Sequence, residues 1–188
     1  MYQQSVSQTV GPFFHNALIS AGQNILVNER TQGERIYIEG RVLDGDNQPV
    51  GDAMVEIWQA DANGLFNHPA DDRQAQADRH FAGFGRSDSV KGGQFFFKTI
   101  KPGIIASATE AQAPYINVRV FARGMLIHAI TRLYFADEPA NERDTVLNLV
   151  PAERRNTLIA TRDDSQGTPI YRFDIVLQGE NETVFFNP

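Results

Sequence analysis

Histidine is the residue best suited to bind a metal or move a proton near neutral pH, and this chain has four. They are His15, His68, His80 and His128. No two of them form an HxH or HExxH pattern or a facial-triad spacing. An isolated histidine is more often a surface or hydrogen-bonded polar residue than a ligand. The sequence has no cysteine, which excludes a disulfide scaffold, a thiolate zinc site, an iron–sulfur cluster and a cysteine nucleophile.

Two acidic pairs and three serines are the other candidates for acid–base or nucleophilic chemistry. The acidic pairs, at 71–72 and 163–164, lie in polar stretches, where a solvated face is a more common explanation than a catalytic pair. The serines, none of which stands in a nucleophile-elbow sequence, are Ser87, Ser89 and Ser165. The residue types and spacings therefore supply no complete catalytic set.

Arg132 is a charged residue in an unusual setting. It lies inside the apolar stretch HAITRLYF at 128–135, which predicts a strand with Ile130, Arg132 and Tyr134 on one face. A guanidinium there needs a partner, because an unpaired buried charge is costly. Two explanations are open: a structural ion pair with a nearby carboxylate, or a bidentate clamp for an anionic ligand.

Composition describes an ordinary soluble globule. The 188 residues are 41% hydrophobic and 21% charged, which is enough for one domain with a sizeable core. The net charge of -6 argues against a nucleic-acid binder, which normally carries a basic patch. The N-terminus has no apolar signal region and the chain has no run of 18 apolar residues, so we expect a cytoplasmic protein.

The elements around these residues read mainly as strands. Thirteen phenylalanines and the scarcity of helical periodicity favour an all-β core. Pro139 and Pro151 suit helix starts and Arg162 suits a helix end. We therefore expect an all-β fold with a two-sheet antiparallel β-sandwich core of six to eight strands and a short helical insertion at about 139–162. The clearest strands are predicted at residues 35–43, 53–58, 94–100, 115–122, 125–135 and 171–177.

The chain divides into an irregular arm and one domain. Residues 1–34 lack periodicity and contain the breaker Gly11–Pro12, followed by a pair of phenylalanines that a free arm rarely exposes. Such an arm packs either on its own domain or on another subunit, and we assign it to a partner subunit. Residues 35–188 form the single domain. Within it, the polar segment 61–93 is long enough to be a functional loop or to cover a site.

Several blocks of this sequence resemble the intradiol ring-cleaving dioxygenases. The core blocks are GRVLDGDNQPVGDAMVEIWQADANGLF, FAGFGRSDSVKGGQFFFKTIKPG, LIHAITRLYF and YRFDIVLQG. The segments SQTVGPFFHNAL and DEPANERDTVLNLVPAERRNTLIATR resemble the subunit of this family that leaves the metal to its partner. The resemblance implies a β-sandwich in an alpha/beta hetero-oligomer. It also implies opening of 3,4-dihydroxybenzoate by O2 to 3-carboxy-cis,cis-muconate, in aromatic catabolism through the beta-ketoadipate pathway.

Catalytic members of the family hold non-haem Fe(III) with two tyrosines and two histidines, the histidines as HxH on one strand. Here Tyr115 and Asn117 stand at the histidine positions, and Ile105 follows the Pro–Gly turn where one tyrosine is expected. The loop at 71–80 contains no tyrosine for the other position. The resemblance therefore implies no catalytic residue and no metal ligand on this chain. The Fe(III) would be held by a homologous iron-bearing beta subunit.

The resemblance also implies what this subunit contributes, namely a wall of the pocket at the subunit interface. In the family that wall comes from a Thr-x-Gly-Pro arm and from an arginine on the strand before a Tyr-Phe pair. The corresponding substrate-binding residues are Thr9, Val10, Gly11, Pro12 and Arg132. The substrate carboxylate is then the partner of the arginine, since a planar anion suits a guanidinium fork.

Two other functions stay open. A transthyretin-like or carboxypeptidase-regulatory-like β-sandwich binding module without an enzymatic partner is compatible with the block at 40–57, although the downstream blocks and the helical segment count against it. A self-sufficient dioxygenase with unusual ligands is the other alternative, and it would lack the usual ligand set for Fe(III).

Overall fold

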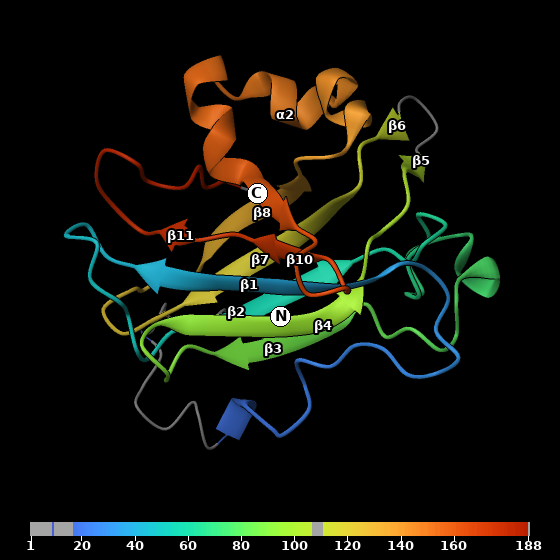
Figure 1. Ribbon diagram of the computed structural model, residues 1–188, viewed down its shortest axis with the longest axis horizontal. Coiled ribbons are helices and arrows are strands. Elements are labelled where there is room, and N and C mark those ends of the chain that lie inside the picture. The colour runs from blue at the N-terminus through green and yellow to red at the C-terminus, as the bar shows by residue number, and fades with distance from the viewer. Residues whose placement is uncertain (1–8, 10–16, 107–110, 188) are drawn as a thin grey trace, which may run out of the picture.

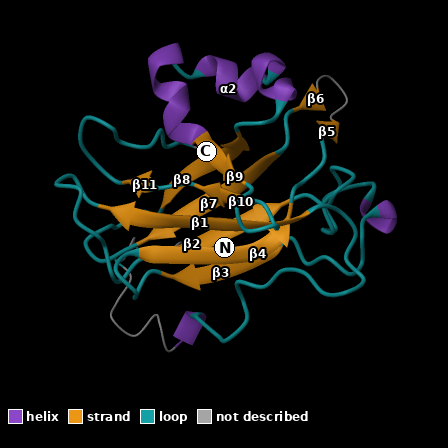
Figure 2. Cartoon of the chain, viewed as in Figure 1, coloured by secondary structure: helices purple, strands orange, loops and turns teal. Residues whose placement is uncertain are grey.

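The computed structural model describes residue 9 and residues 17–106 and 111–187, and most of its regular structure is strand (Figure 2). Within these residues, nine strands form one sheet: β1 (Arg35–Leu43), β2 (Met54–Gln59), β3 (Phe84–Asp88), β4 (Gln94–Ile100), β7 (Tyr115–Phe121), β8 (Ala129–Phe135), β9 (Ile159–Asp163), β10 (Ile170–Arg172) and β11 (Ile175–Val176). A second, two-stranded sheet pairs β5 (Ile105–Ala106) with β6 (Ala111–Gln112). The helical elements are η1 (Gln74–Gln76), η2 (Pro139–Arg143), α2 (Thr145–Leu149) and η3 (Ala152–Leu158).

The large sheet is mixed and curled. Its order is β11-β1-β10-β9-β8-β7-β2-β3, with β4 on the other edge of β1. The pairs β1–β10, β1–β11 and β8–β9 are parallel, and the other pairs are antiparallel. Figure 1 shows β1 and β4 lying in front of β2 and β7. The expectation of a mostly-strand fold is confirmed, but hydrogen bonding is continuous around the curl and not every pair is antiparallel.

β9 is the strand that makes the sheet continuous, and the sequence placed it in a helix. It pairs with β10 on one side and with the end of β8 on the other. The expected helical insertion at 139–162 is therefore too long, because the helical turns end at Leu158. Ile159 and Thr161 are β-branched and favour the extended backbone found here. Arg162 consequently lies on a strand and does not end a helix.

The main core lies between the two halves of the curled sheet. The alternation predicted for 35–43 is confirmed, since Ile36 and Ile38 on β1 are fully buried. Gly40 shares this face for a steric reason: a Cβ there would lie 1.8 Å from the carbonyl oxygen of Phe173. The predicted last strand, 171–177, is divided into β10 and β11. Between them the Asp174 carboxylate, in place of a backbone carbonyl, accepts a hydrogen bond from the backbone N–H of Arg41 at 2.8 Å.

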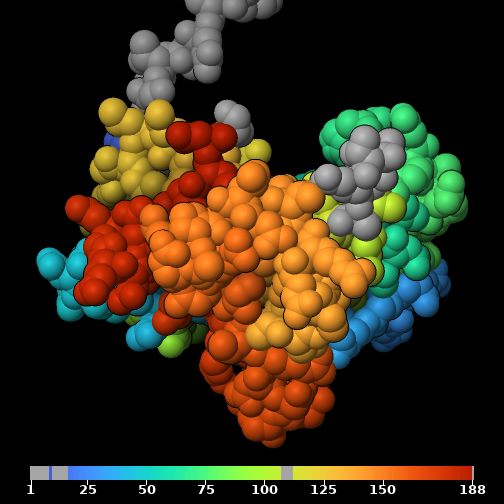
Figure 3. All heavy atoms as spheres, turned by 90° about the horizontal axis from the view of Figure 1, so that it is seen from above, coloured from blue at the N-terminus to red at the C-terminus, as the bar shows by residue number. Residues whose placement is uncertain are grey.

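The helical insertion covers one end of the sheet and closes a second, smaller core. Leu147, Val150 and Leu158 pack there with Tyr115 and Tyr134 of the sheet. Figure 3 shows the orange residues of this insertion across the centre of that face, with C-terminal residues in red beside them. None of the described helices is both long and apolar enough to cross a membrane.

The long segment 61–93 is a structured loop followed by a strand that the sequence did not indicate. β3 has its buried positions at Gly85 and Ser87, so it shows no apolar alternation. The loop before it is organised by the buried Asp61 carboxylate, which accepts backbone hydrogen bonds from Asn63, Leu65 and Asp78.

Candidate functional site

Three neighbouring strands place Arg132 in a row of polar and aromatic side chains. Trp58 on β2 pairs with Asn117 on β7, and Asn117 pairs with Arg132 on β8. Directly opposed residues point to the same face of a sheet, and adjacent strands lie about 4.8 Å apart, so Trp58 and Arg132 have backbones roughly 10 Å apart. The next row on this face joins Tyr115 to Tyr134. As predicted, Arg132 and Tyr134 share one face, opposite the buried core residues Thr131 and Leu133.

Arg132 is half-buried and is held by two tyrosines. Its guanidinium carbon lies 3.9 Å from the centre of the Tyr115 ring. One terminal nitrogen of the guanidinium donates a hydrogen bond of 3.3 Å to the Tyr134 hydroxyl. Within the part of the chain that the structure describes, no carboxylate forms a direct ion pair with Arg132. The structural ion pair considered for Arg132 is therefore absent among these residues.

A buried carboxylate lies one hydrogen bond further away. The Tyr134 hydroxyl donates to Oδ1 of Asp144 at 3.0 Å. Asp144 is fully buried and precedes α2, whose Leu147 N–H it also accepts at 2.8 Å, while its Oδ2 accepts the Ala113 N–H at 2.9 Å. Burial raises the pKa of Tyr134 well above the ordinary value for tyrosine, so the phenol is protonated at neutral pH. The Tyr134 hydroxyl thus links the negative charge of the Asp144 carboxylate to the positive charge of the Arg132 guanidinium.

Tyr115, Asn117 and Ile105, which the resemblance aligns with iron ligands, do not fit an Fe(III) ion. Tyr115 is 6% exposed and lies beneath the Arg132 guanidinium, so a metal cation there would meet a fixed positive charge. Asn117 is a neutral amide, and Ile105 offers no donor atom. Among the described residues, no group of three or more His, Asp or Glu side chains lies close enough to hold a metal.

The described histidines are dispersed. His68 packs edge-on against Trp58 at 6.0 Å between ring centres, and His128 stacks on Phe121 at 5.1 Å. His80 lies in the loop before β3, where its backbone carbonyl accepts a hydrogen bond from Thr31. His15 lies outside the described residues.

The N-terminal arm is only partly within the described residues. The Thr9 hydroxyl accepts a hydrogen bond of 3.0 Å from the backbone N–H of Gly124, in the turn between β7 and β8. Asn117 opposite Arg132 is four residues before the end of β7 at Phe121, so Thr9 lies roughly 13 Å or more from the Arg132 backbone along the hairpin. The structure does not bring these two predicted residues together. Val10, Gly11 and Pro12 lie outside the described residues.

An aromatic pocket of about 790 Å³ begins beside Trp58. Trp58 stacks on Phe66 at 6.0 Å between ring centres, and the pocket wall is completed by residues of the loop that follows. There Arg73 forms an ion pair of 3.0 Å with Asp71, and this hydrogen bond lowers the pKa of Asp71 to about 2. Sequence reasoning missed this pocket, although the single tryptophan at a strand end before a long polar loop was a usable signal.

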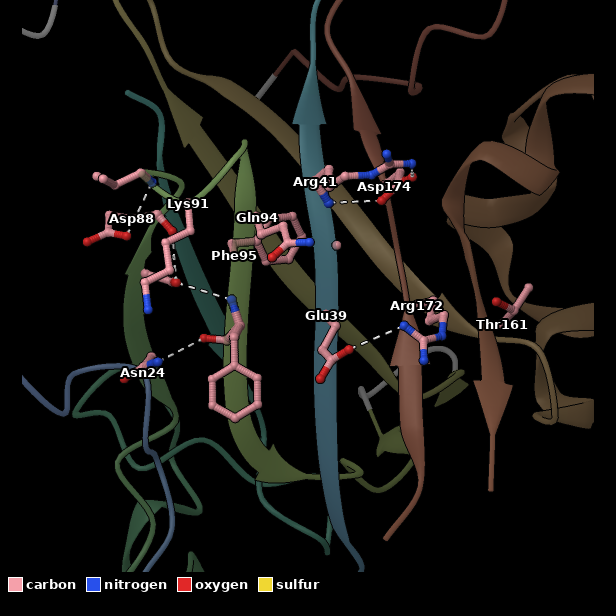
Figure 4. Close-up of a pocket in the computed structure, with 14 residues that line it drawn as sticks. Asn24, Glu39, Arg41, Asp88, Lys91, Gln94, Phe95, Thr161, Arg172 and Asp174 are labelled. Carbon is pink, nitrogen blue, oxygen red and sulfur yellow. Dashed lines mark hydrogen bonds and ion pairs between the residues drawn. The ribbon is translucent and has the colours of Figure 1, made fainter. Parts of the chain in front are cut away.

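A larger groove of about 1000 Å³ crosses the outer face of β4, β1 and β10 (Figure 4). Its charges are largely paired with one another: Arg41 with Asp174 at 2.8 Å, and Arg172 with Glu39 at 3.3 Å. None of the residues of the Arg132 row lines it. The groove is therefore a surface feature separate from the Arg132 site.

Comparison with known proteins places this geometry in a family. The family model described as Dioxygenase matches residues 9–179. The protocatechuate 3,4-dioxygenase alpha chain of Burkholderia cepacia is 45% identical, over 98% of each chain. The beta chain from the same organism is 32% identical, over 94% of this chain and 77% of that one. Among solved structures, the dioxygenase domain of a dioxygenase carbohydrate-binding protein fusion from Streptomyces sp. SirexAA-E has a TM-score of 0.66 at 24% identity, covering 94% of this chain and 96% of that chain.

The family match extends over the β-strand blocks and over the helical insertion. A small β-sandwich binding module accounts for the block at 40–57 but not for these downstream parts. The solved structure supports the fold, and the two relatives support the family. The chain belongs to the intradiol ring-cleaving dioxygenase family.

Proposed function

We propose that this chain is the alpha subunit of a protocatechuate 3,4-dioxygenase and completes the substrate pocket of a homologous, Fe(III)-bearing beta subunit. The observation that carries the proposal is the half-buried Arg132 guanidinium, which has no direct carboxylate partner among the described residues. The 45% identity to an alpha chain over nearly the whole length supports the assignment.

The guanidinium is suited to an aromatic carboxylate. It has five N–H donors in a planar fork, and a single hydrogen bond, to Tyr134, uses one of them in the described structure. The remaining donors match the two oxygens of a carboxylate, and partial burial strengthens such a charge-assisted pair. We assign Arg132 to the carboxylate of 3,4-dihydroxybenzoate.

Ring opening is assigned to the partner. Tyr115, Asn117 and Ile105 supply neither the tyrosines nor the histidines of the family's iron site, and Arg132 places a positive charge beside Tyr115. When bound to the beta subunit, Fe(III) supplies activation of the catecholic ring toward O2. This chain supplies orientation, which changes rates by orders of magnitude because a bound geometry replaces a bimolecular search.

The remaining parts of the proposal concern assembly. Residues 1–34 are an arm that packs on the beta subunit of an alpha/beta hetero-oligomer, while Leu26 near the end of this arm is buried in this chain's own core. Residues 35–188 are one β-sandwich-like domain. Thr9, Val10, Gly11 and Pro12 of the arm join the pocket wall on the support of their Thr-x-Gly-Pro sequence. Since Thr9 binds the hairpin tip here, this role requires the arm to take another path in the assembly. We propose a cytoplasmic location.

The test compares iron content and ring cleavage in this chain alone and in complex with its beta partner. We expect iron and activity in the complex only. Arg132→Met in the complex should raise KM for 3,4-dihydroxybenzoate roughly 10- to 100-fold, because a hydrogen-bonded charge is lost. Arg119→Met, which removes an exposed guanidinium from β7, is the matched control. Stoichiometric iron with full activity in the isolated chain would overturn the proposal.

A further inference from the structure

We propose that Tyr134 is a positioning residue for Arg132: with Asp144 behind it and Tyr115 below, it fixes the guanidinium so that its free edge faces the carboxylate of an aromatic acid. This inference rests on the proposed function and deepens it. It assigns a role to a buried tyrosine and a buried aspartate, which act on the ligand through Arg132.

The direction of the hydrogen bonds follows from the acceptors. Asp144 is fully buried, and its oxygens accept the N–H groups of Leu147 and Ala113. A carboxylate offers no proton, so the Tyr134 hydroxyl must donate its single proton to Asp144. A lone pair of the same hydroxyl is then left for the guanidinium nitrogen of Arg132 at 3.3 Å. The phenol is therefore fixed as an acceptor toward the arginine.

The Tyr115 ring fixes the plane of the guanidinium. The guanidinium carbon lies 3.9 Å from the ring centre, and Tyr115 is directly opposite Tyr134 in the sheet, with ring centres 6.1 Å apart. The Tyr115 ring thus fixes the plane of the guanidinium, and the Tyr134 hydroxyl binds one of its edges. An arginine side chain held in this way loses less rotational freedom when it binds a ligand. The arrangement is therefore preorganised for a planar anion.

Asn117 supports a ligand on this same face. It is directly opposite Arg132 on β7, between Arg132 and the aromatic pocket beside Trp58. Its side-chain amide has no hydrogen-bond partner within the described residues. The face of the sheet that carries Arg132 thus also carries an amide and an aromatic wall, which suits a ring that carries a carboxylate.

A purely structural role is the competing explanation, because Asp144 also caps α2 and binds the strand segment at Ala113. Substitution of Asp144 therefore risks the fold. Tyr134→Phe is the cleaner change, since it removes one hydroxyl and keeps the buried ring and both backbone hydrogen bonds to the Asp144 carboxylate. Tyr37→Phe is the matched control: Tyr37 is on β1, and its hydroxyl has no hydrogen bond among the described residues.

The experiment uses the complex with the beta partner. KM for 3,4-dihydroxybenzoate and competitive inhibition by catechol, which lacks the carboxylate, are measured for the wild type, Arg132→Met, Tyr134→Phe, Tyr37→Phe and the double variant Arg132→Met/Tyr134→Phe. We expect Tyr134→Phe to raise KM about 5- to 10-fold and to leave catechol inhibition within about 2-fold, because one hydrogen bond to a charged group is lost. The double variant should be no worse than Arg132→Met alone, since both changes act through one group.

The outcomes separate the inference from the proposed function. If Arg132→Met raises KM but Tyr134→Phe matches Tyr37→Phe, the positioning role is wrong and the proposed function stands. If Tyr134→Phe weakens the binding of catechol and of 3,4-dihydroxybenzoate equally and also lowers the melting temperature, the role of Tyr134 is structural and the inference fails. If Arg132→Met itself leaves KM unchanged, the proposed function fails.

Discussion

The guanidinium of Arg132 lies 3.9 Å from the centre of the Tyr115 ring, and the two residues are held on adjacent strands, β8 and β7. They lie one row apart on the same face. A cation over the ring is favourable in itself, by about 0.5–2 kcal/mol depending on desolvation. The same contact disfavours a second cation at this place, because the chain's own guanidinium already lies over the Tyr115 ring.

Placing histidines at positions 115 and 117, where the resemblance expects the family's histidine ligands, is predicted not to create an iron site. In the double variant Tyr115→His/Asn117→His, both imidazoles would point to one face, but the chain would still lack both tyrosine ligands and would keep Arg132 nearby. We expect substoichiometric iron by metal analysis of the purified variant. Iron near one equivalent, with the colour of a tyrosinate complex, would show that this chain has a ligand we have not identified.

Gly40 is predicted to be essential for the pairing of β1 with the C-terminal strands. A Cβ at this position would lie 1.8 Å from the Phe173 carbonyl oxygen and 2.7 Å from the Phe95 ring. Since neither neighbour is a flexible side-chain end, Gly40→Ala should lower the free energy of unfolding by about 3 kcal/mol. Urea denaturation measures this change. Gly51→Ala is the control, because a Cβ there meets nothing within 4 Å. Equal stability of the two variants would contradict the packing described here.

Sequence patterns predicted the parts of this fold in which burial follows apolar alternation. The strand at 35–43 was clear because Ile36 and Ile38 alternate with polar residues. β3 was not visible, because its buried positions are Gly85 and Ser87. β9 was assigned to a helix because Arg162 suited a helix end, whereas its hydrogen bonds to β8 and β10 are set by distant parts of the chain.

The sequence also predicted only part of the candidate site, namely Arg132 and not its neighbours. Arg132 stood out because a charge in an apolar strand needs a partner. Its actual neighbours, Tyr115 and Tyr134, depend on strand register, which a single sequence does not specify. Asp144 had a local signal, as an aspartate before a short helical segment, but that signal indicates a helix cap and not a link to the arginine.

The buried Asp61 carboxylate is predicted to hold the loop that forms the wall of the aromatic pocket. It accepts backbone hydrogen bonds from Asn63, Leu65 and Asp78, at 2.8–3.0 Å, and is 2% exposed. Asp61→Ala should leave these N–H groups unpaired and cost about 2 kcal/mol. Hydrogen exchange should become faster at 63–81, while the exposed Asp72→Ala serves as the control in the same loop. Unchanged exchange in the loop would mean that other contacts organise it.

Asp137 joins three side chains at the end of β8. Its carboxylate accepts hydrogen bonds from Lys101 and Arg162 at 3.0 Å and from Tyr171 at 2.9 Å. Partial burial is the largest single influence and raises its pKa, but the hydrogen bonds from Lys101 and Tyr171 more than offset it, so the net pKa lies below the ordinary value of 3.8. The carboxylate is therefore stabilised in its charged form in the folded chain.

A depressed carboxylate pKa contributes stability that is present above the unfolded-state pKa and is lost as pH falls below it. Asp137→Asn should therefore lower the free energy of unfolding by roughly 1 kcal/mol at pH 7, with the value limited by solvent screening. The difference from wild type should shrink as pH falls from about 4 through the lowered pKa of folded Asp137, because the unfolded chain takes up the proton first and the folded carboxylate is protonated only at lower pH. Urea denaturation from pH 7 to pH 2.5 measures this, with the exposed Asp46→Asn as control. A difference that stays constant down to pH 2.5 would assign the effect to packing and not to charge.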